Sequence, residues 1–384
     1  MENRPLITRV VLENYKSIAF CDVKLGPLAI LVGPNGAGKS NFLDALRFLS
    51  EAMSPPLERV LQNRGGFTSI LRRGPVSEGH LGIRIEFVTP EAVAGSYSVR
   101  FRSDSAADYL VEHEECEVDG EVVFKAEKGV LHPSSRYLAA PQPSSRLYLP
   151  YMAQYPESGA VFDLLNQCQF YNFNPEQFRL PIPSENAKRV LRSDGANLAN
   201  LVNYIWLKHP TVSERVNQYL RAIIPSLREI ETVERGGYRN LEFIFDLIEG
   251  SLSPRQTSDG TMRALAVLVA LFQRLVETPV DLVGIEEPET ALHPAVSGAL
   301  FDAMREASAS VQVIVTTHSA DLLDKKEIDT DAILAVEMLG GTTQIGKVDK
   351  PGKEALKERL YTVGELMRMN YLRPEALTSS DIES

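Results

Sequence analysis

The sequence predicts an α/β fold in which a largely parallel sheet is covered by helices on both faces. Three short apolar runs, at 28–32, 280–289 and 311–319, have the length and continuity of strands that are buried on both sides. Segments with helical spacing of apolar residues follow them or lie between them, at 40–53, 261–277 and 296–308. A glycine-rich turn separates the first of these strands from the first helix. Strands that alternate with helices in this way are typical of parallel sheets.

Composition restricts the class of protein. The chain has 384 residues, of which 44% are hydrophobic and 24% charged, as in globular proteins. No apolar run approaches the roughly 18 residues that span a bilayer, and the N-terminus lacks the apolar core of a signal peptide. We therefore expect a cytoplasmic protein that does not bind a membrane. The net charge of −11 opposes non-specific binding to nucleic acid. The separate Cys21, Cys116 and Cys168 predict free thiols.

The rest of the chain suggests a division into three parts: 1–105, 106–235 and 236–384. The first part contains further strands, and 109–129 carries seven carboxylates that we expect on a solvated acidic face. A Pro- and Ser-rich stretch follows and reads as an extended connection. The other elements expected are strands at 8–18, 81–88, 96–103 and 239–249, helices at 197–209, 212–224 and 354–372, a connection at 132–150, and a hairpin at 332–348 that turns at Gly340-Gly341.

The glycine-rich turn fits the phosphate-binding pattern G-x-x-x-x-G-K-[ST]. Glycines allow backbone N–H groups to converge on phosphate oxygens, and the N-terminus of the following helix favours the same negative charge. Lys39 is expected to reach the β- and γ-phosphates, and Ser40 to place its hydroxyl on Mg²⁺. A bare glycine turn is the alternative, but a strand precedes the turn and a helix follows. The predicted nucleotide-binding residues are Gly33, Pro34, Asn35, Gly36, Ala37, Gly38, Lys39, Ser40 and Asn41.

A second motif, "DLVGIEEPETALHP", places two carboxylates at the end of an apolar strand. One carboxylate there can anchor Mg²⁺ while the other polarises an attacking water. We assign Glu286 to the metal and Glu287 to the catalytic role. The alternative is two exposed glutamates at a strand end, and it is less favoured in a chain that carries a phosphate loop.

Two shorter motifs complete the set. His318 follows the strand "VQVIVTT", at the end of the sheet where parallel strands place their ligands, and a neutral imidazole there could hydrogen-bond a γ-phosphate. The alternative is a structural or simply exposed histidine. Ser258, Asp259 and Gly260 begin an apolar helix. Taken alone, "SDG" is best explained as a helix cap.

Together the motifs resemble the ABC-type ATPase heads of the SMC, RecF and OLD group, and within it a set of compact bacterial ATPases without a nuclease domain. The resemblance is carried by "GPNGAGKSN", "SDGTMRALAVL", "IEEPETALHP" and "QVIVTTHSADLLD", and extends to "NYKSI" and "LRSDGANLANLV". It implies a P-loop NTPase with an antiparallel β subdomain and an inserted helical subdomain. It also implies ATP and Mg²⁺ as ligands, catalysis by Glu287 with His318, and a homodimer or higher homo-oligomer that sandwiches ATP. Ser258, Asp259 and Gly260 would then act in trans.

The chain departs from the pattern of that group at several positions. Asp259 replaces the first signature glycine, Glu286 stands where an aspartate is usual, and His293 or a neighbour takes the place of the D-loop aspartate. Gln62 is our candidate for the Q-loop glutamine and a third metal contact, and an ordinary loop amide is the alternative. The long stretch between Lys39 and Glu287 indicates an insertion or lid, but it lacks the heptads of a coiled-coil arm.

Four functions remain open from the sequence. The first is an ATP-driven switch, for which the resemblance alone implies a role in DNA repair or anti-phage defence. The second is an ATP-gated DNA-binding protein, with ordinary surface as the alternative explanation of its basic residues Arg72, Arg73, Lys188, Arg189 and Arg192. The third is an ATPase subunit that controls a separate nuclease or other effector, because the stretch after His318 is short for a nuclease domain. The fourth, a transporter subunit, is disfavoured by Asn41, by the long insertion and by Pro288-Glu289.

Overall fold

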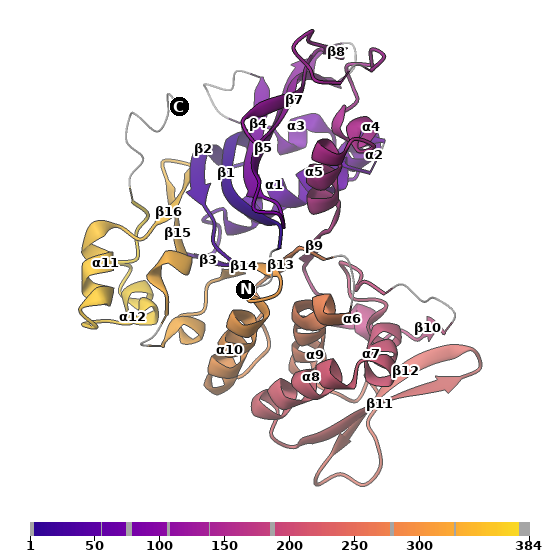
Figure 1. Cartoon of the computed structure of the whole chain (residues 1–384). Helices are drawn as coiled ribbons and strands as arrows, with labels where there is room; N and C mark the ends of the chain where they lie inside the picture. The colour runs from indigo at the N-terminus through magenta and orange to yellow at the C-terminus, as the bar shows by residue number, and fades with distance from the viewer. Residues whose placement is uncertain are drawn as a thin grey trace. The chain divides into compact units, whose positions relative to one another are not determined.

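The computed structural model of the chain describes residues 4–54, 56–73, 79–105, 108–137, 139–184, 189–276, 280–325 and 328–375. The chain forms two compact units (Figure 1). The first comprises Met1–Cys168, Asp329–Lys357 and Tyr371–Ser384, and the second comprises Gln169–Ile328 and Glu358–Asn370. Each unit is described by itself below, and the division into 1–105, 106–235 and 236–384 stays a prediction.

A curved antiparallel sheet dominates the first unit. Its strand order is β2-β1-β4-β5-β6-β7-β8. Side chains alternate between buried and exposed positions along strands such as β4 and β5, so one face of the sheet is buried and the other is solvated. The strands are β1 (Leu6–Tyr15), β2 (Ile18–Lys24), β4 (His80–Val88), β5 (Ala94–Asp104), β6 (Asp108–Val118), β7 (Glu121–Glu127) and β8 (Val130–Leu131).

Helix α1 (Lys39–Ala52) covers the buried face of this sheet. The ring of Phe48 lies 6.3 Å from that of Tyr15 on β1 and 5.7 Å from that of Phe101 on β5, centroid to centroid. These aromatic contacts fix the helix that follows the phosphate loop onto the sheet. Smaller helices complete this unit: α2 (Leu57–Gln62), α3 (Phe67–Ile70), α4 (Leu149–Met152), α5 (Pro156–Asn166) and α11 (Lys350–Lys357), with the 3₁₀ turn η4 (Thr330–Ala332).

Three more strands of the first unit hold the phosphate loop. Strand β3 (Leu28–Val32), buried throughout, pairs in parallel with β15 (Ile333–Leu339). β15 in turn pairs antiparallel with β16 (Thr342–Lys347), so that β15 and β16 form the expected hairpin. Its two turn residues, Gly340 and Gly341, have φ values of 56° and 77°. Positive φ at both positions suits the right-handed twist of a two-residue hairpin, which explains the glycine pair.

The second unit has helices around a short parallel strand pair. Strand β13 (Leu282–Glu286) pairs in parallel with β14 (Gln312–Thr317), and β10, β12 and β11 form a separate antiparallel sheet. Helices α8 and α10 pack against α9, which is buried from Gly260 to Phe272 (Figure 1). Its other elements are β9 (Cys168–Tyr171), β10 (Ile182–Pro183), β11 (Leu227–Arg235), β12 (Tyr238–Phe245), α6 (Pro175–Phe178), α7 (Leu198–Lys208), α8 (Pro210–Ile223), α9 (Asp259–Phe272), α10 (Ser297–Ala307), α12 (Val363–Arg368), η1 (Gln273–Val276), η2 (Pro294–Val296) and η3 (Asp321–Leu323).

The α/β class predicted from the sequence is therefore confirmed, with parallel pairs, an antiparallel β lobe and a helical region. The helices expected at 197–209 and 212–224 are present as α7 and α8. Within the described residues, no helix has both the length and the apolar content needed to cross a bilayer. Cys21, Cys116 and Cys168 are buried free thiols.

The single terminal helix expected over 354–372 is wrong. Helix α11 ends at Lys357, Arg359 has a φ of 56°, and a new helix, α12, begins after Thr362. The Thr362 hydroxyl accepts from the backbone N–H of Glu365, and the Glu365 carboxylate accepts from the N–H of Thr362. This capping box starts a separate helix, and the positive φ of Arg359 prevents continuity with α11.

The solvated acidic face expected over 109–129 is wrong at one carboxylate. Strands β6 and β7 carry this stretch, and Glu114 on β6 is fully buried. Its oxygens accept from the Tyr97 hydroxyl at 2.9 Å and from the N–H groups of Tyr148 at 2.6 Å and Leu149 at 2.9 Å. Glu114 thus anchors the start of α4 to the sheet. Burial raises the pKa of Glu114 to about 7, although these three donors act in the opposite direction.

The buried carboxylate predicts a pH-dependent stability. A folded-state pKa above the unfolded value stabilises the fold fully below the unfolded pKa, near 4.5, and this contribution is lost as the pH rises through about 7. Glu114→Gln should remove this dependence, whatever constant cost the amide adds. From pH 5 to pH 8 the unfolding free energy of the unsubstituted chain should fall by about 2 to 3 kcal/mol more than that of Glu114→Gln, as measured by urea denaturation. Glu121→Gln, on an exposed side chain, is the control, and parallel pH profiles for Glu114→Gln and the unsubstituted chain would contradict the assignment.

Candidate functional site

The phosphate loop lies between β3 and α1, as predicted. Pro34, Asn35 and Gly36 are exposed, whereas Ala37 and Lys39 are buried. Gly36 and Gly38 have φ values of 78° and 103°, a region that residues with a Cβ rarely adopt. Lys39 donates from Nζ to the carbonyls of Gly33 at 2.8 Å and Pro34 at 2.9 Å. A fixed cation beside an exposed, glycine-containing turn at a helix N-terminus is an arrangement that binds phosphate.

Two glycines of the loop are required by close packing on the β15–β16 hairpin. A Cβ at Gly33 would lie 2.0 Å from the carbonyl oxygen of Val336 on β15. A Cβ at Gly38 would lie 2.1 Å from Oγ1 of Thr343 on β16. Both distances are far below any tolerated contact, so only glycine fits. The loop therefore needs glycine for contact with the hairpin as well as for backbone conformation.

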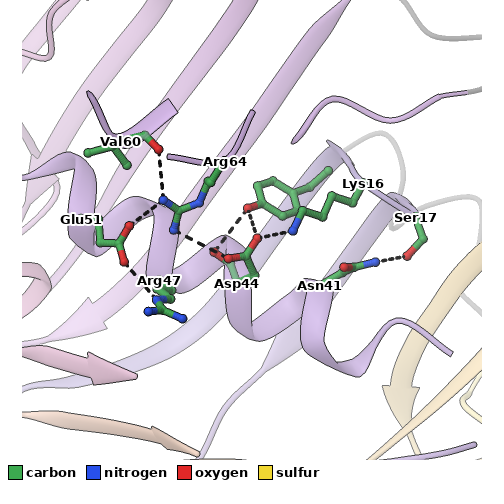
Figure 2. Close-up of polar contacts among 9 residues, drawn as sticks. Lys16, Ser17, Asn41, Asp44, Arg47, Glu51, Val60 and Arg64 are labelled. Atoms are coloured by element: carbon green, nitrogen blue, oxygen red, sulfur yellow. Dashed lines mark hydrogen bonds and ion pairs between the residues drawn. The ribbon is translucent and has the colours of Figure 1, made fainter. Parts of the chain in front are cut away.

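Charged side chains fasten α1 behind the loop (Figure 2). Asp44 accepts from the Lys16 ammonium at 2.6 Å and the Tyr15 hydroxyl at 2.7 Å, and Arg64 lies 3.7 Å away. Burial alone would raise the pKa of Asp44, but these hydrogen bonds and cations outweigh it and hold the pKa below its usual value. Arg64 also pairs with Glu51. The network ties the "NYKSI" segment and α2 to the helix that starts at Lys39.

The second unit brings Glu287 and His318 together. Because β13 and β14 run parallel with Glu286 opposite Thr316, the residues after both strands emerge at the same edge. The Glu287 N–H donates to the carbonyl of Thr316 at 3.0 Å, and Glu287 Oε1 lies 2.9 Å from His318 Nδ1. Both side chains remain partly exposed, so water and ligand can reach them. A carboxylate paired with an imidazole is suited to accept and relay a proton.

A buried arginine fixes the backbone under these carboxylates. Arg263, on α9, donates from Nη2 to the carbonyls of Glu286 at 3.2 Å and Glu287 at 3.1 Å, and from Nη1 to Phe173 at 2.8 Å. Glu287 has a φ of 44°, which is costly for a residue with a side chain. The guanidinium, with several donors in a rigid plane, holds this strained peptide in place. Burial lowers the pKa of Arg263, and the nearby carboxylates act against that shift.

A third carboxylate, Glu289, lies behind the pair. Its side chain is 8% exposed and accepts a hydrogen bond from Thr317 Oγ1. Burial raises the pKa of Glu289 above its usual value. Because Thr317 is the last residue of β14 and precedes His318, this buried contact attaches the loop after β13 to the end of β14.

The "SDG" segment caps α9. The Ser258 hydroxyl accepts from the Thr261 N–H at 3.2 Å, which confirms that Ser258 caps the helix. Ser258 is nevertheless exposed. Asp259 forms an ion pair with Arg179. Gly260 packs against the loop after β13, since a Cβ there would lie 2.3 Å from the carbonyl oxygen of Ala291. A role of these residues in trans stays a prediction.

The remaining predicted residues are spread over both units. Ser40 is exposed in the first turn of α1, Gln62 is exposed at the end of α2, and Glu286 ends β13. His293 accepts from the Ala295 N–H and caps η2. The metal roles of Ser40, Glu286 and Gln62 stay predictions. Among the described side chains, no group of three or more His, Cys, Asp or Glu is arranged to hold a metal ion.

The candidate nucleic-acid contacts are partly engaged elsewhere. Arg72 donates to the Thr342 hydroxyl at 2.8 Å, Arg192 pairs with Asp194 at 2.9 Å, and Arg189 lies over the Tyr204 ring. Arg73 is exposed, and Lys188 lies outside the described residues.

Sequence reasoning missed Arg263 and Thr343. A signal for Arg263 existed, because it is the one charge within the apolar run "GTMRALAVLVALF" and a buried charge requires partners. Thr343 carried no signal, since a threonine after a Gly-Gly turn is ordinary in a hairpin.

The support that Arg263 gives predicts a large cost on its removal. Arg263→Met keeps apolar bulk but removes the guanidinium from the carbonyls of Phe173, Glu286 and Glu287, of which Glu287 keeps a bond from the Thr290 N–H. The unfolding free energy should fall by about 2 to 4 kcal/mol in urea denaturation. Arg305→Met is the control: Arg305 has an exposed side chain on α10, and its loss should change stability by less than about 0.5 kcal/mol. Equal effects of the two substitutions would refute the role of Arg263.

Residues 28–324 match the protein family described as "AAA domain, putative AbiEii toxin, Type IV TA system". Over 53 residues the chain is 45% identical to the structural maintenance of chromosomes protein 4 of Dictyostelium discoideum, covering 13% of this chain and 4% of that protein. It is 31% identical over 103 residues to the DNA replication and repair protein RecF of Magnetococcus marinus, covering 26% of each. The chain thus spans only a small part of both curated relatives.

Solved structures share the fold over most of the chain. One is the Smc head bound to the C-terminal winged-helix domain of ScpA, with a TM-score of 0.59 at 15% identity, covering 91% of this chain and 99% of that one. Another is the Smc head with an extended coiled coil, bound to the C-terminal domain of ScpA and derived from Pyrococcus furiosus, with a TM-score of 0.55 at 14% identity, covering 93% and 99%. The chain therefore belongs to the family described as "AAA domain, putative AbiEii toxin, Type IV TA system", and its fold is that of an SMC/RecF-like P-loop ATPase head of the ABC type.

Proposed function

We propose that the chain binds and hydrolyses ATP and that ATP joins two copies of it into a closed dimer. The observation that carries this proposal is the pair of Glu287 and His318 at the shared edge of β13 and β14. A phosphate loop supplies binding alone, whereas a partly exposed carboxylate beside an imidazole supplies a group that can accept the proton of an attacking water.

The chemistry can be assigned residue by residue. The loop N–H groups and Lys39 bind the phosphates, and Glu287 orients and deprotonates the water. Because a carboxylate only accepts hydrogen bonds, His318 donates to Glu287 from Nδ1. In this proposal the imidazole of His318 holds the Glu287 carboxylate in place and faces the γ-phosphate.

Magnesium fits the oxygen donors that the chain offers. The hydroxyl of Ser40 and the carboxylate of Glu286 are hard ligands of the kind Mg²⁺ takes, and Mg²⁺ commonly completes its shell with substrate phosphates and water. In this proposal these two residues hold the ion, and Gln62 contributes an amide oxygen. Bound Mg²⁺ would neutralise charge on the phosphates during transfer.

Support for the dimer comes from the signature segment. Ser258 is exposed at the N-terminus of a fourteen-residue helix, where the helix dipole favours an anion. In the proposed dimer this end of α9 faces the γ-phosphate held by the second copy, and Gly260 lets the loop after β13 lie against the same helix end.

The biological role that we propose is either DNA repair or anti-phage defence. A relative named for DNA replication and repair and a family named for a toxin–antitoxin system support roles in repair and in anti-phage defence respectively. In either role the ATP-dependent closure would be transmitted to DNA or to a separate effector protein in the cytoplasm. Binding of a partner by the Smc heads supports the effector alternative.

Glu287→Gln tests the catalytic assignment. The amide keeps the size and a hydrogen-bonding oxygen but cannot accept a proton, so hydrolysis should fall by at least about 100-fold while ATP binding persists. The variant should then accumulate as a dimer with ATP and Mg²⁺, measured by light scattering, with single- or double-stranded DNA added in parallel runs. Glu249→Gln, at an exposed residue, should behave as the unsubstituted chain. An unchanged hydrolysis rate in Glu287→Gln would sink the proposal.

Ser258→Arg tests the role of the signature in trans. A long cation at this position should block closure of the dimer and lower hydrolysis about tenfold or more, while the affinity of the monomer for ATP stays within about twofold. Ser258→Ala is the matched control, because it removes the helix cap, worth about 1 kcal/mol, without adding bulk. Loss of ATP binding itself in Ser258→Arg would assign Ser258 a purely structural role.

A further inference from the structure

We propose that Thr343 is a positioning residue for nucleotide binding, and that a relay of hydrogen bonds from Asn41 through Ser17 and Thr343 holds the phosphate loop in its binding conformation. This inference rests on the proposed binding of ATP at the loop. It adds to that function a residue of the C-terminal hairpin that touches no nucleotide itself.

The relay consists of three short hydrogen bonds within the first unit. Asn41 donates from Nδ2 to Ser17 Oγ at 2.6 Å, as Figure 2 shows. Ser17 Oγ lies 2.6 Å from Thr343 Oγ1, and Thr343 Oγ1 donates to the carbonyl of Ala37 at 2.9 Å. The relay therefore begins just after the loop, at Asn41, and returns to the loop at Ala37.

The direction of the relay follows from the number of protons available. A carbonyl oxygen only accepts, so the single hydroxyl proton of Thr343 is used on Ala37. Thr343 can then only accept from Ser17, whose own proton is used in that bond. Ser17 in turn accepts from the amide of Asn41. Each hydroxyl donates once and accepts once along this path, and replacing either one with a methyl group breaks the relay.

The last bond decides where one phosphate-binding group points. A peptide unit is planar and trans, so the carbonyl of Ala37 and the N–H of Gly38 point in opposite directions. Holding the carbonyl on the hairpin side directs the Gly38 N–H to the other side, away from the hairpin. In a loop that binds phosphate through converging N–H groups, this N–H is one of those that must face the ligand. Without the Thr343 hydroxyl, nothing in the relay opposes rotation of this peptide.

Burial makes the hydroxyl hard to replace. Thr343 is fully buried, so bulk water has no access to Ala37 from this side. Gly38 leaves room for the threonine, since a Cβ at Gly38 would lie 2.1 Å from Thr343 Oγ1. The backbone N–H of Thr343 donates separately to the carbonyl of Ser17 at 2.9 Å. That bond does not depend on the side chain, so a substitution at Thr343 can leave the hairpin in place.

Thr343→Val tests the proposal, because valine has nearly the shape of threonine without the hydroxyl. The Kd for ATP, measured by isothermal titration calorimetry, should rise about tenfold, the cost of one buried carbonyl without a donor. KM should rise in parallel while kcat changes by less than about twofold, as for a group that affects binding alone. Thr343→Ser, which restores the hydroxyl, should bring Kd and KM back to within about twofold of the unsubstituted values. A purely structural role would instead lower the melting temperature without this split between KM and kcat.

Ser17→Ala provides an independent test at the middle of the relay. Ala37 keeps its donor in this variant, so Kd should rise by only about two- to threefold. An unchanged Kd in Ser17→Ala, or in a folded Thr343→Val, would overturn the relay. If the unsubstituted chain itself does not bind ATP, the proposed function fails, and the two failures are thus distinguishable.

Discussion

The close packing of the phosphate loop on the β15–β16 hairpin is the constraint on which the first unit depends. Gly33 and Gly38 stand where any Cβ would strike Val336 or Thr343, so the loop and a hairpin from a distant part of the sequence can pack this closely only because both positions lack a side chain. Binding geometry is therefore set by contacts between segments that are distant in sequence. The ion pairs around Asp44 serve the same end from the other side, because they fasten the helix that carries Lys39.

In the second unit the buried Arg263 holds the candidate catalytic residues in place, as the hairpin holds the phosphate loop in the first unit. Arg263 lies on α9, whose first turn is capped by Ser258, and its guanidinium holds the carbonyls of Glu286 and Glu287. Burying a guanidinium is costly unless its donors are used, and here both terminal nitrogens donate to carbonyls, one of them that of a glutamate with positive φ. A shift of α9 would therefore move the peptide that positions the proposed catalytic carboxylate. The helix that Ser258 caps and the backbone of Glu287 are thus joined by the side chain of Arg263, in addition to the packing of Gly260 on Ala291.

The elements that were predicted correctly are those that depend on local sequence patterns. The strand, glycine turn and helix around Lys39 follow from periodicity and backbone preference over a few residues, and so do the strands that end before Glu287 and His318. The failures have non-local or small causes. The partners of Glu114 lie on β5 and at the start of α4, so its burial could not be deduced from its acidic neighbours. The terminal helix broke because Thr362 and Glu365 form a local cap within a pattern that otherwise looked continuous.

The departure at Asp259 bears most directly on the proposed dimer. A bare carboxylate beside Ser258 would repel the phosphate that this helix end is meant to receive, by an amount that grows as water is excluded on closure. Arg179 pairs with Asp259 and opposes that charge, and it directly follows α6, which packs against α9. The pair thus leaves the dipole of α9 as the main field at Ser258. In the proposed dimer, the ion pair with Arg179 therefore makes an aspartate beside Ser258 compatible with a phosphate contact in trans.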